Sequence, residues 1–415
     1  MNGPVLPTDG HHLDINGDLK LLSAWERRFL CDNAGMRTLS NPGQHVDCLV
    51  IGGGLLGMLS ARELARSGMS VMLLERGSLG QESSWAGGGI LSPLTPWHCS
   101  PELEALVVSS QRIYPSLVRE LERESGIDAQ WTRSGMLALG IDDMEAVMSW
   151  SARTGCRVHT LDQTGVNARE PELAPLRVDE RALWLPDIAQ VRNPRLLKAL
   201  KNSIIKHGVN IKERCEARRL WLSGNKVIGV VCEAEKLTAD RVVIAGGAWS
   251  EELLRQTGTT AGVLPVRGQM LMYRAPRDMI SAIIIRDGHY LIPRRDGHVL
   301  VGSTLEYSGF DKSTTAAALT LLRRRALDLV PALARCPLIR QWAGLRPGSA
   351  GGIPLIGAHP TIERLYLNCG HFRNGVTLAP ASAARLAKIV LDTDKYGKLR
   401  SDRADVVQTL DVPFH

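Results

Sequence analysis

The segment from Val46 to Glu75 constrains the fold of this chain more than any other stretch. It reads VDCLVIGGGLLGMLSARELARSGMSVMLLE. The run Cys48 to Ile51 is continuously apolar, as expected of a parallel strand that is covered on both faces. Leu56, Leu59 and Leu64 then recur at the spacing of the buried face of a helix. A second apolar run precedes the closing acid, so the segment predicts a strand, a helix and a second strand.

Three glycines occupy the turn between the first strand and the helix. Gly52, Gly54 and Gly57 fill the spacing G-x-G-x-x-G. The first permits a tight turn, the second lets a pyrophosphate approach the backbone, and the third lets the helix lie close to the sheet. The helix, predicted over Leu55–Arg66, directs its N-terminal N–H groups at the phosphates. Glu75 is placed to bind a ribose diol, and the unit as a whole predicts a dinucleotide site. The alternative, a glycine-rich turn that binds nothing, must accept the entropic cost of three glycines.

The loop after this unit distinguishes between dinucleotides. Residues Gly80 to Pro93 read GQESSWAGGGILSP, a small-residue loop that can pass close to a flat ring system. The stretch LERGSLGQESSWAGGG resembles the flavin-binding N-terminus of the D-amino-acid-oxidase-like oxidoreductases, and within them the glycine oxidases of thiamine biosynthesis. The resemblance implies FAD rather than NAD. It implies a non-covalent FAD, since the segment Trp342 to Gly357 contains no cysteine to which a flavin could be attached.

Further signatures of this family follow in order and extend the resemblance to Leu391. The strand-like run Val242 to Ala245 leads into Gly246 and Gly247, which resemble the second flavin-domain signature. The stretch GHFRNG, which begins at Gly370, resembles the family's flavin loop and precedes a predicted helix. The N-terminus of that helix is expected to stabilise negative charge on the flavin pyrimidine. The glycine unit and the resemblance together imply cofactor contacts from Gly52, Gly54, Leu55, Leu56, Gly57, Glu75, Arg76, Ser83, Ser84, Gly88, Gly89, Ile90, Ala217, Gly246, Gly247, His371, Phe372, Arg373, Asn374, Gly375, Val376 and Thr377.

Arg346 is the main candidate for substrate binding. It is the single cation of the segment WAGLRPGSAGGIPLIG, and a guanidinium offers two parallel N–H donors to a carboxylate. No Asp or Glu lies between Leu345 and Thr361, but the residues alone leave open whether Arg346 pairs with an acid elsewhere. The resemblance of WAGLRPG to the family motif implies that it binds the substrate carboxylate. Arg373 is expected to be the second basic residue of the site, with a solvent-exposed loop arginine as the alternative.

The stretch from Pro265 to Leu305 alternates apolar and polar residues, which predicts an antiparallel sheet above the substrate. By pattern alone, Tyr290 and Arg294 are ordinary surface residues of this sheet. The resemblance changes this interpretation for Tyr290, whose position in HYLIPR implies contact with the substrate, but not for Arg294. His371 is expected to contribute its backbone rather than shuttle a proton, and no side chain is expected to act as acid or base.

The predicted fold is α/β: a Rossmann-like FAD-binding domain, discontinuous in sequence, with an inserted antiparallel-sheet substrate domain of α+β type. The FAD-binding domain is predicted over 46–125, 186–256 and 338–395, and the substrate domain over 126–185 and 257–337. Residues 1–45 are a polar extension, which is either native or the result of a true start at Met36. Residues 396–415 are a C-terminal tail.

Composition narrows the remaining function classes. The net charge is +7, but the basic residues are spread along the chain and only 5% of residues are aromatic, which argues against nucleic-acid binding. Eight cysteines without C-x-x-C spacing favour a reducing cytoplasm, and neither a metal site nor a membrane span is expected. The resemblance implies a homo-oligomer, a homotetramer in the family.

The implied reaction is the oxidation of glycine, sarcosine or a D-amino acid such as D-alanine. A hydride passes from the neutral amine to flavin N5, and O2 reoxidises the flavin to give hydrogen peroxide. The imine either hydrolyses to glyoxylate and ammonia or supplies dehydroglycine for the thiazole of thiamine. Three alternatives remain open: a D-amino-acid or sarcosine oxidase, a quinone-linked D-amino-acid dehydrogenase, and a flavin-binding scaffold without turnover.

Overall fold

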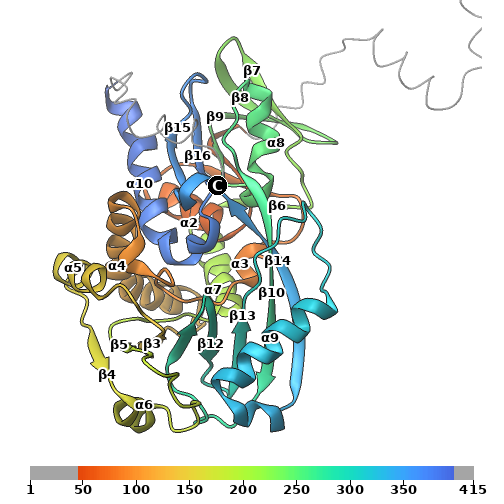
Figure 1. Ribbon diagram of the computed structural model, residues 1–415. Helices are drawn as coiled ribbons and strands as arrows, with labels where there is room; N and C mark the ends of the chain where they lie inside the picture. Colours follow the sequence, from red (N-terminus) through yellow and green to blue (C-terminus); the bar gives the residue numbers. More distant parts are fainter. Residues whose placement is uncertain (1–44, 397–415) are drawn as a thin grey trace, which may run out of the picture. The chain divides into compact units, whose positions relative to one another are not determined.

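The computed structural model describes the backbone of residues 45–396 and the side chains as far as residue 392, so most of the predicted extension and tail lies outside the described residues. Within this range the strands form two sheets of eight strands each (Figure 1). The described helices are α2 (Leu55–Arg66), α3 (Ser83–Ala86), α4 (Pro101–Ser125), α5 (Met144–Thr154), α6 (Gln163–Arg169), α7 (Asn193–Lys206), α8 (Ser250–Leu254), α9 (Ala316–Leu329) and α10 (Gly375–Tyr396).

The first sheet is mainly parallel, with the order β15-β16-β9-β1-β2-β6, and β7 and β8 extend it beside β9. β1 lies between β9 and β2 and runs parallel to both. The carboxyl ends of these strands therefore meet at one edge of the sheet, which is where open α/β sheets bind ligands. Its strands are β1 (Val46–Ile51), β2 (Val71–Glu75), β6 (Asn210–Glu213), β7 (Arg219–Ser223), β8 (Lys226–Val231), β9 (Lys236–Ile244), β15 (Leu355–Ala358) and β16 (Leu365–Cys369).

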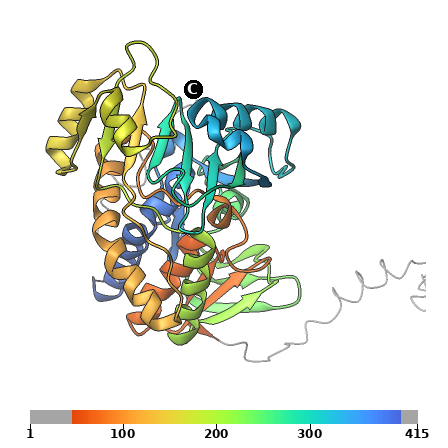
Figure 2. The same ribbon diagram turned by 90° about the horizontal axis from the view of Figure 1, so that it is seen from below.

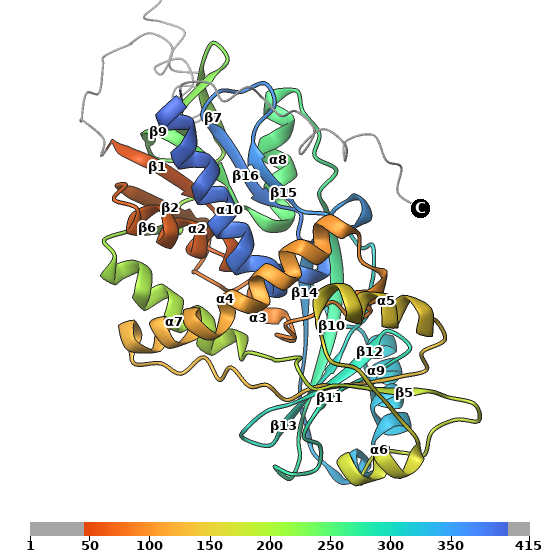
Figure 3. The same cartoon turned by 90° about the vertical axis from the view of Figure 1, so that its left-hand side faces the viewer.

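Four helices, α2, α4, α7 and α10, cover one face of this sheet (Figure 3). Their apolar stripes meet in one buried cluster, to which each helix contributes fully buried leucines or alanines, such as Leu121 of α4 and Leu386 of α10. The α2–α4 contact also contains a buried cation, because Arg62 is fully shielded from solvent. It pairs with Glu124 at 2.8 Å and with Glu120 at 3.0 Å. A second apolar cluster, which includes residues of the β7–β8 hairpin and of α8, fills the other face.

The second sheet has the order β14-β10-β13-β12-β11-β3-β5-β4. Figure 2 shows its teal strands between the yellow helices α5 and α6 and the blue-green α9. Leu291 packs in the cluster that contains α9, whereas Tyr290 and Ile292 pack in the opposite cluster with Ile90. Tyr290 therefore faces the loop that follows α3. The strands are β3 (Met136–Leu139), β4 (His159–Leu161), β5 (Ala182–Leu185), β10 (Leu264–Arg274), β11 (Ile283–Arg286), β12 (His289–Pro293), β13 (His298–Gly302) and β14 (Leu338–Gly348).

Most local predictions agree with this structure. The first helix has the predicted bounds, and the turns after β7 and β12 contain Gly224 and Gly297, both with positive φ. Two features differ. β11 pairs with β3 in parallel, so the sheet is not wholly antiparallel. β14, which was predicted within the FAD-binding segments, pairs along β10 in the second sheet.

Among the described residues, no helix combines the length and apolarity that a bilayer span requires.

Candidate active site

The glycine turn after β1 is packed too tightly for any side chain. Gly52 has φ +108°, and a Cβ there would lie 2.4 Å from the carbonyl oxygen of Ala245 at the end of β9. A Cβ on Gly57 would lie 1.8 Å from the carbonyl oxygen of Gly52. These two contacts bring the first turn of α2 against the ends of β1 and β9. Gly57 thus has the packing role that its spacing predicts.

The groups around this turn are held by hydrogen bonds to neighbouring loops. The hydroxyl of Ser84 accepts a bond from the backbone N–H of Leu55 at 2.9 Å. Glu75 accepts bonds from the backbone N–H groups of Gly53 and Gly77, each at 2.8 Å. One carboxylate has about four lone-pair positions, so Glu75 keeps acceptor capacity for the hydroxyls of a ribose. The acid at the end of β2 is fixed in place rather than free to move.

A cavity of about 400 Å3 opens at this edge of the first sheet. It is lined by the glycine turn, the end of β2, the short helix α3, the loop before β7 and the start of α10. Trp249 also lines it and carries the guanidinium of Arg76 3.4 Å from its ring centre. The predicted cofactor residues that line it are Gly52, Gly54, Leu55, Leu56, Glu75, Arg76, Ser83, Ser84, Ala217, Gly246, Gly247, His371, Phe372, Arg373, Gly375 and Val376.

A second cavity, of about 310 Å3, adjoins the first. Gly87, Arg346, Phe372, Arg373 and Val376 line both. The smaller cavity adds Gly88, Gly89, Ile90, Tyr290 and Asn374 from the predicted set. Gly57 and Thr377 line neither cavity. The hydroxyl of Thr377 donates to the carbonyl of Ile90 at 3.0 Å and thereby ties α10 to the glycine loop.

Arg346 lies on β14, where both cavities meet. Its guanidinium donates to the hydroxyl of Ser303 at 2.7 Å and to the carbonyl of Thr304 at 3.1 Å. Both partners are neutral oxygens, so they orient the cation without cancelling its charge. A Cβ on Gly268 would lie 2.2 Å from its nitrogen atoms, which explains the glycine at that position of β10. Arg346 is therefore a positioned cation with charge available for a ligand.

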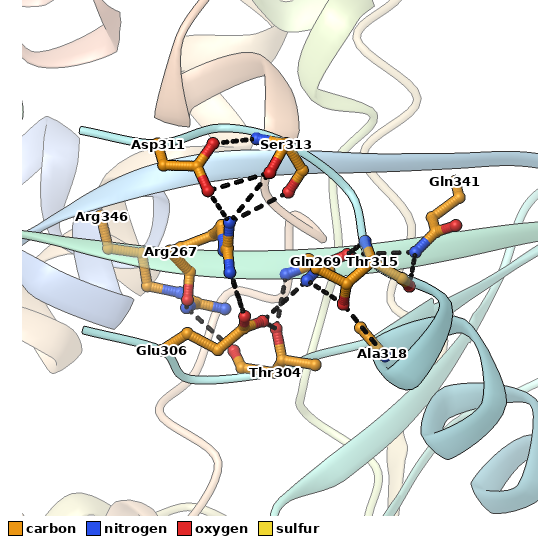
Figure 4. A network of polar contacts seen from close by, with 10 residues as sticks. All are labelled: Arg267, Gln269, Thr304, Glu306, Asp311, Ser313, Thr315, Ala318, Gln341 and Arg346. Carbon is orange, nitrogen blue, oxygen red and sulfur yellow. Dashed lines mark hydrogen bonds and ion pairs between the residues drawn. The ribbon is translucent and has the colours of Figure 1, made fainter. Parts of the chain in front are cut away.

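Glu306 lies in the polar network around Arg346, but its carboxylate pairs with a different arginine, Arg267 (Figure 4). Glu306 pairs with Arg267 at 2.6 Å, and Arg267 also pairs with Asp311. Gln269 donates to the same carboxylate at 2.9 Å. Glu306 raises the pKa of Arg346 through its charge, but its oxygens are taken by these partners and it forms no ion pair with Arg346. The structure answers the question that the sequence left open: within the described residues, Arg346 has no acid as an ion-pair partner.

Two arginines, Arg346 and Arg373, line both cavities. Burial lowers the pKa of the Arg346 guanidinium, the adjacent Tyr290 phenol raises it, and the positive charge of Arg373 lowers it again. Arg373 itself is exposed and follows Phe372, whose φ of +44° is unusual for a bulky residue. Arg373 lines both cavities, which favours the predicted site role over the alternative of a solvent-exposed loop arginine. Two cations without an acid between them favour an anionic ligand.

Glycines on two sides of Tyr290 determine where its ring can lie. A Cβ on Gly302 would lie 2.5 Å from the ring, and a Cβ on Gly88 would lie 3.2 Å from it. The phenol contacts the sulfur of Met270 at 3.6 Å. Its hydroxyl is therefore directed to the smaller cavity beside Arg346.

His371 is fully buried and bonds the hydroxyl of Ser382 at 3.0 Å through Nε2. Burial lowers the pKa of this imidazole to about 3, so it is neutral at physiological pH. Its carbonyl accepts a bond from the N–H of Asn374 at 2.9 Å, which helps to shape the turn before α10. These contacts agree with a residue that shapes the loop.

Arg294 is the clearest error of the sequence interpretation. It was expected on the surface of the second sheet, but it is buried, and burial lowers its pKa to about 9. It donates to the carbonyl oxygens of Gly88 at 2.6 Å and Val191 at 2.9 Å, and to the side chain of Gln190 at 2.7 Å. Arg294 thus fixes the glycine loop against the sheet. The three acceptors come from segments far from Arg294 in sequence, so no local pattern reveals them.

Other residues of the site also carried no sequence signal. Asn193, at the start of α7, donates to the carbonyl of Ser84 at 2.8 Å, and Trp342 donates to the carbonyl of Ala86 at 3.0 Å. Together they hold α3 between the two sheets. Gly268 is the exception, because a glycine inside a strand often marks the close approach of another group.

The larger cavity fits a dinucleotide cofactor. The glycine turn leaves room for a pyrophosphate, the α2 N-terminus favours negative charge, and Glu75 retains acceptor capacity for a ribose. The second cavity, which the Gly87–Gly89 loop and Val376 of α10 help to line, is left for a small ligand beside the cofactor. No cluster of His, Cys, Asp or Glu suited to a metal ion occurs among the residues that the structure describes.

Comparison with known proteins shows that this chain belongs to the FAD dependent oxidoreductases. The sequence model of the family "FAD dependent oxidoreductase" matches residues 47–389. The glycine oxidase of Pseudomonas aeruginosa is 43% identical over 346 residues, which cover 82% of this chain and 94% of that protein. The bifunctional protein ThiO/ThiG of Synechocystis is 30% identical over 83% of this chain and 52% of its own length. The crystal structure of glycine oxidase from Geobacillus kaustophilus superposes with a TM-score of 0.79 at 28% identity, over 84% of this chain and 95% of that one.

Proposed function

Because this chain belongs to the family of FAD dependent oxidoreductases, we propose that it oxidises glycine and other small amines. The observation that carries this proposal is the pair Arg346 and Arg373, which line the smaller cavity and form no ion pair with any acid among the described residues. An amino acid supplies the missing anion through its carboxylate. A bidentate contact with a guanidinium also fixes its orientation.

In this proposal the larger cavity holds FAD through the glycine turn, Glu75 and the start of α10. When bound, FAD accepts a hydride from the substrate α-carbon and passes the electrons to dioxygen. The N-terminus of α10 directs its positive end at the cavity that the flavin ring would fill. Arg294 holds the Gly88 segment that forms another part of the lining.

The substrate is held by three side chains. Arg346 binds the carboxylate, Tyr290 contacts it from the second sheet, and Arg373 adds a second positive charge from the flavin loop. No Asp or Glu occurs among the described residues that line the smaller cavity, so no carboxylate is placed to take a proton from the substrate amine. Hydride transfer requires the amine in its neutral form, and the residues of the site contribute by orientation.

The smaller cavity is large enough to admit several small amines. About 310 Å3 exceeds what glycine needs, so sarcosine and D-alanine should also enter. Because several similar proteins are glycine oxidases and others carry the name ThiO/ThiG, we infer that the imine product serves thiamine biosynthesis. We further infer a cytoplasmic homo-oligomer. The seven cysteines that the structure describes are free thiols, in keeping with that compartment.

A substrate panel under air tests the proposal. The purified protein is mixed with glycine, sarcosine or D-alanine, and hydrogen peroxide and the 2-oxo acid are measured. We expect equal amounts of peroxide and glyoxylate from glycine. A quinone-linked dehydrogenase would instead reduce an added quinone and produce little peroxide. A protein that produces neither product with any of the three would refute the proposal.

A further inference from the structure

Two cysteines lie in contact at the edge of the larger cavity. The sulfur atoms of Cys215 and Cys232 are 3.3 Å apart. Cys215 follows β6 and lines the cavity, and Cys232 follows β8. The backbone bond from Arg218 N–H to the carbonyl of Val231, at 2.9 Å, holds the two segments together. A disulfide needs about 2.05 Å between its sulfurs, so the gap has to close by only about 1.2 Å.

The two thiols differ in access. Cys232 is buried, and burial raises the pKa of its thiol to about 12. Cys215 is partly exposed and shares a wall with the cavity. Cys215 is therefore the more accessible of the two thiols, while Cys232 is shielded and held against it. An exposed thiol beside a buried partner is the usual arrangement of an oxidisable cysteine and its resolving cysteine.

We propose that Cys215 and Cys232 are a peroxide-dependent modification site that forms a reversible intramolecular disulfide. The Cys215 thiolate attacks one oxygen of hydrogen peroxide, the O–O bond breaks, and sulfur is oxidised to a sulfenic acid while hydroxide leaves. Cys232 sulfur then attacks the sulfenic sulfur, its proton joins the departing hydroxide, and the S–S bond forms. In sum, two thiols and one peroxide give one disulfide and two waters. Under the proposed function, the protein produces this oxidant itself.

The disulfide would connect the cofactor wall, at Cys215, to the turn between β8 and β9. The N–H of Cys215 donates to the carbonyl of Glu75 at 2.9 Å, so the Cys215 segment is already attached to the end of β2. The N–H of Cys232 donates to the carbonyl of Glu235 at the turn between β8 and β9, also at 2.9 Å. The bond would close a loop between residues 17 positions apart and restrict the unfolded chain. We therefore expect the oxidised protein to melt at a higher temperature.

The test uses the purified flavin-loaded protein, reduced with dithiothreitol and freed of the reductant. It is exposed to added hydrogen peroxide, alkylated, digested and analysed by mass spectrometry. We expect a cross-linked Cys215–Cys232 peptide, a loss of two of the eight thiols, and a rise in Tm, all reversed by dithiothreitol. A parallel sample receives glycine under air, with and without catalase. If glycine oxidation fails but added peroxide still forms the cross-link, the proposed function is wrong and the modification site stands.

Serine variants separate the roles of the two thiols. In Cys232→Ser, the Cys215 sulfenic acid has no resolving partner and should accumulate as a dimedone adduct. In Cys215→Ser, Cys232 should remain reduced at the same peroxide dose. Cys336→Ser is the matched control, since it removes a partly buried thiol outside both cavities and should leave the cross-link unchanged. Wild-type protein in which Cys215 reaches the sulfinic acid without a cross-link, or stays reduced, would overturn the proposal.

Discussion

Replacing Arg346 with lysine keeps the positive charge of the proposed carboxylate site but removes its geometry. A lysine ammonium cannot offer two parallel N–H donors, and it cannot keep both bonds that Arg346 makes to Ser303 and Thr304. Loss of one partner of a buried, charge-assisted contact costs about 2 to 5 kcal/mol. At about 1.4 kcal/mol per tenfold change, kcat/KM for glycine should fall by at least roughly 30-fold.

The loss should divide between KM and kcat in an informative way. If Arg346 only anchors the carboxylate, the apparent KM rises and the rate at saturating glycine is unchanged. If it also orients the α-carbon, the anaerobic rate of flavin reduction at saturating glycine falls as well. Both are measured by peroxide production and by stopped-flow absorbance. FAD content should equal that of the wild type.

A control on the same strand separates this effect from general damage. Arg340 lies on β14, is exposed and lines neither cavity, so Arg340→Lys should change kcat/KM by less than about twofold. Gly268→Ala offers an independent perturbation, because the new methyl group must displace the Arg346 guanidinium. An Arg346→Lys protein that retains FAD and wild-type kinetics would refute the carboxylate role, and Arg373 would then be the candidate.

Three further predictions address the cofactor and the fold. Gly57→Ala places a methyl group 1.8 Å from the carbonyl oxygen of Gly52, so the folded protein should contain little FAD, whereas flavin at wild-type stoichiometry would contradict the packing argument. Arg62→Met leaves the half-buried Glu124 without its arginine partner and should lower the free energy of unfolding by about 3 kcal/mol in urea denaturation; an unchanged midpoint would count against it. Burial lowers the pKa of His359 from 6.5 to about 4. As the pH falls, His359 of the unfolded chain therefore takes up a proton before His359 of the folded protein does. The contribution of neutral His359 to the free energy of unfolding is complete above pH 6.5, and below that it should decline by about 1.4 kcal/mol per pH unit toward pH 4. His359→Gln should reduce this slope.

The sequence predicted the parts of the site that depend on local backbone geometry. The unit from Val46 to Glu75 has its strand, helix and glycines in consecutive positions, and each local preference supports the same conformation. The turn that leads to Arg373 was located for the same reason. In both segments glycine spacing and apolar runs determine the structure with little help from the rest of the chain.

The sequence failed where a residue's environment comes from distant segments. The burial of Arg294 depends on acceptors from two loops more than a hundred positions away, and no periodicity encodes such contacts. That Arg346 has no ion-pair partner among the described residues follows from the pairing of Glu306 with Arg267, two residues that an antiparallel bridge between distant segments brings together. Residues 140–181 gave no clear prediction because their helices and strand are short and surrounded by polar residues.

The most direct test of the account is the absorption spectrum of the purified protein when glycine is added without oxygen. The account predicts a yellow protein that releases FAD on denaturation, and whose oxidised-flavin absorbance disappears on addition of glycine and returns when air is admitted, with one peroxide formed per flavin. A colourless protein that FAD cannot reconstitute would contradict the cofactor site. A yellow protein whose spectrum does not respond to glycine, sarcosine or D-alanine would contradict the proposed amine oxidation.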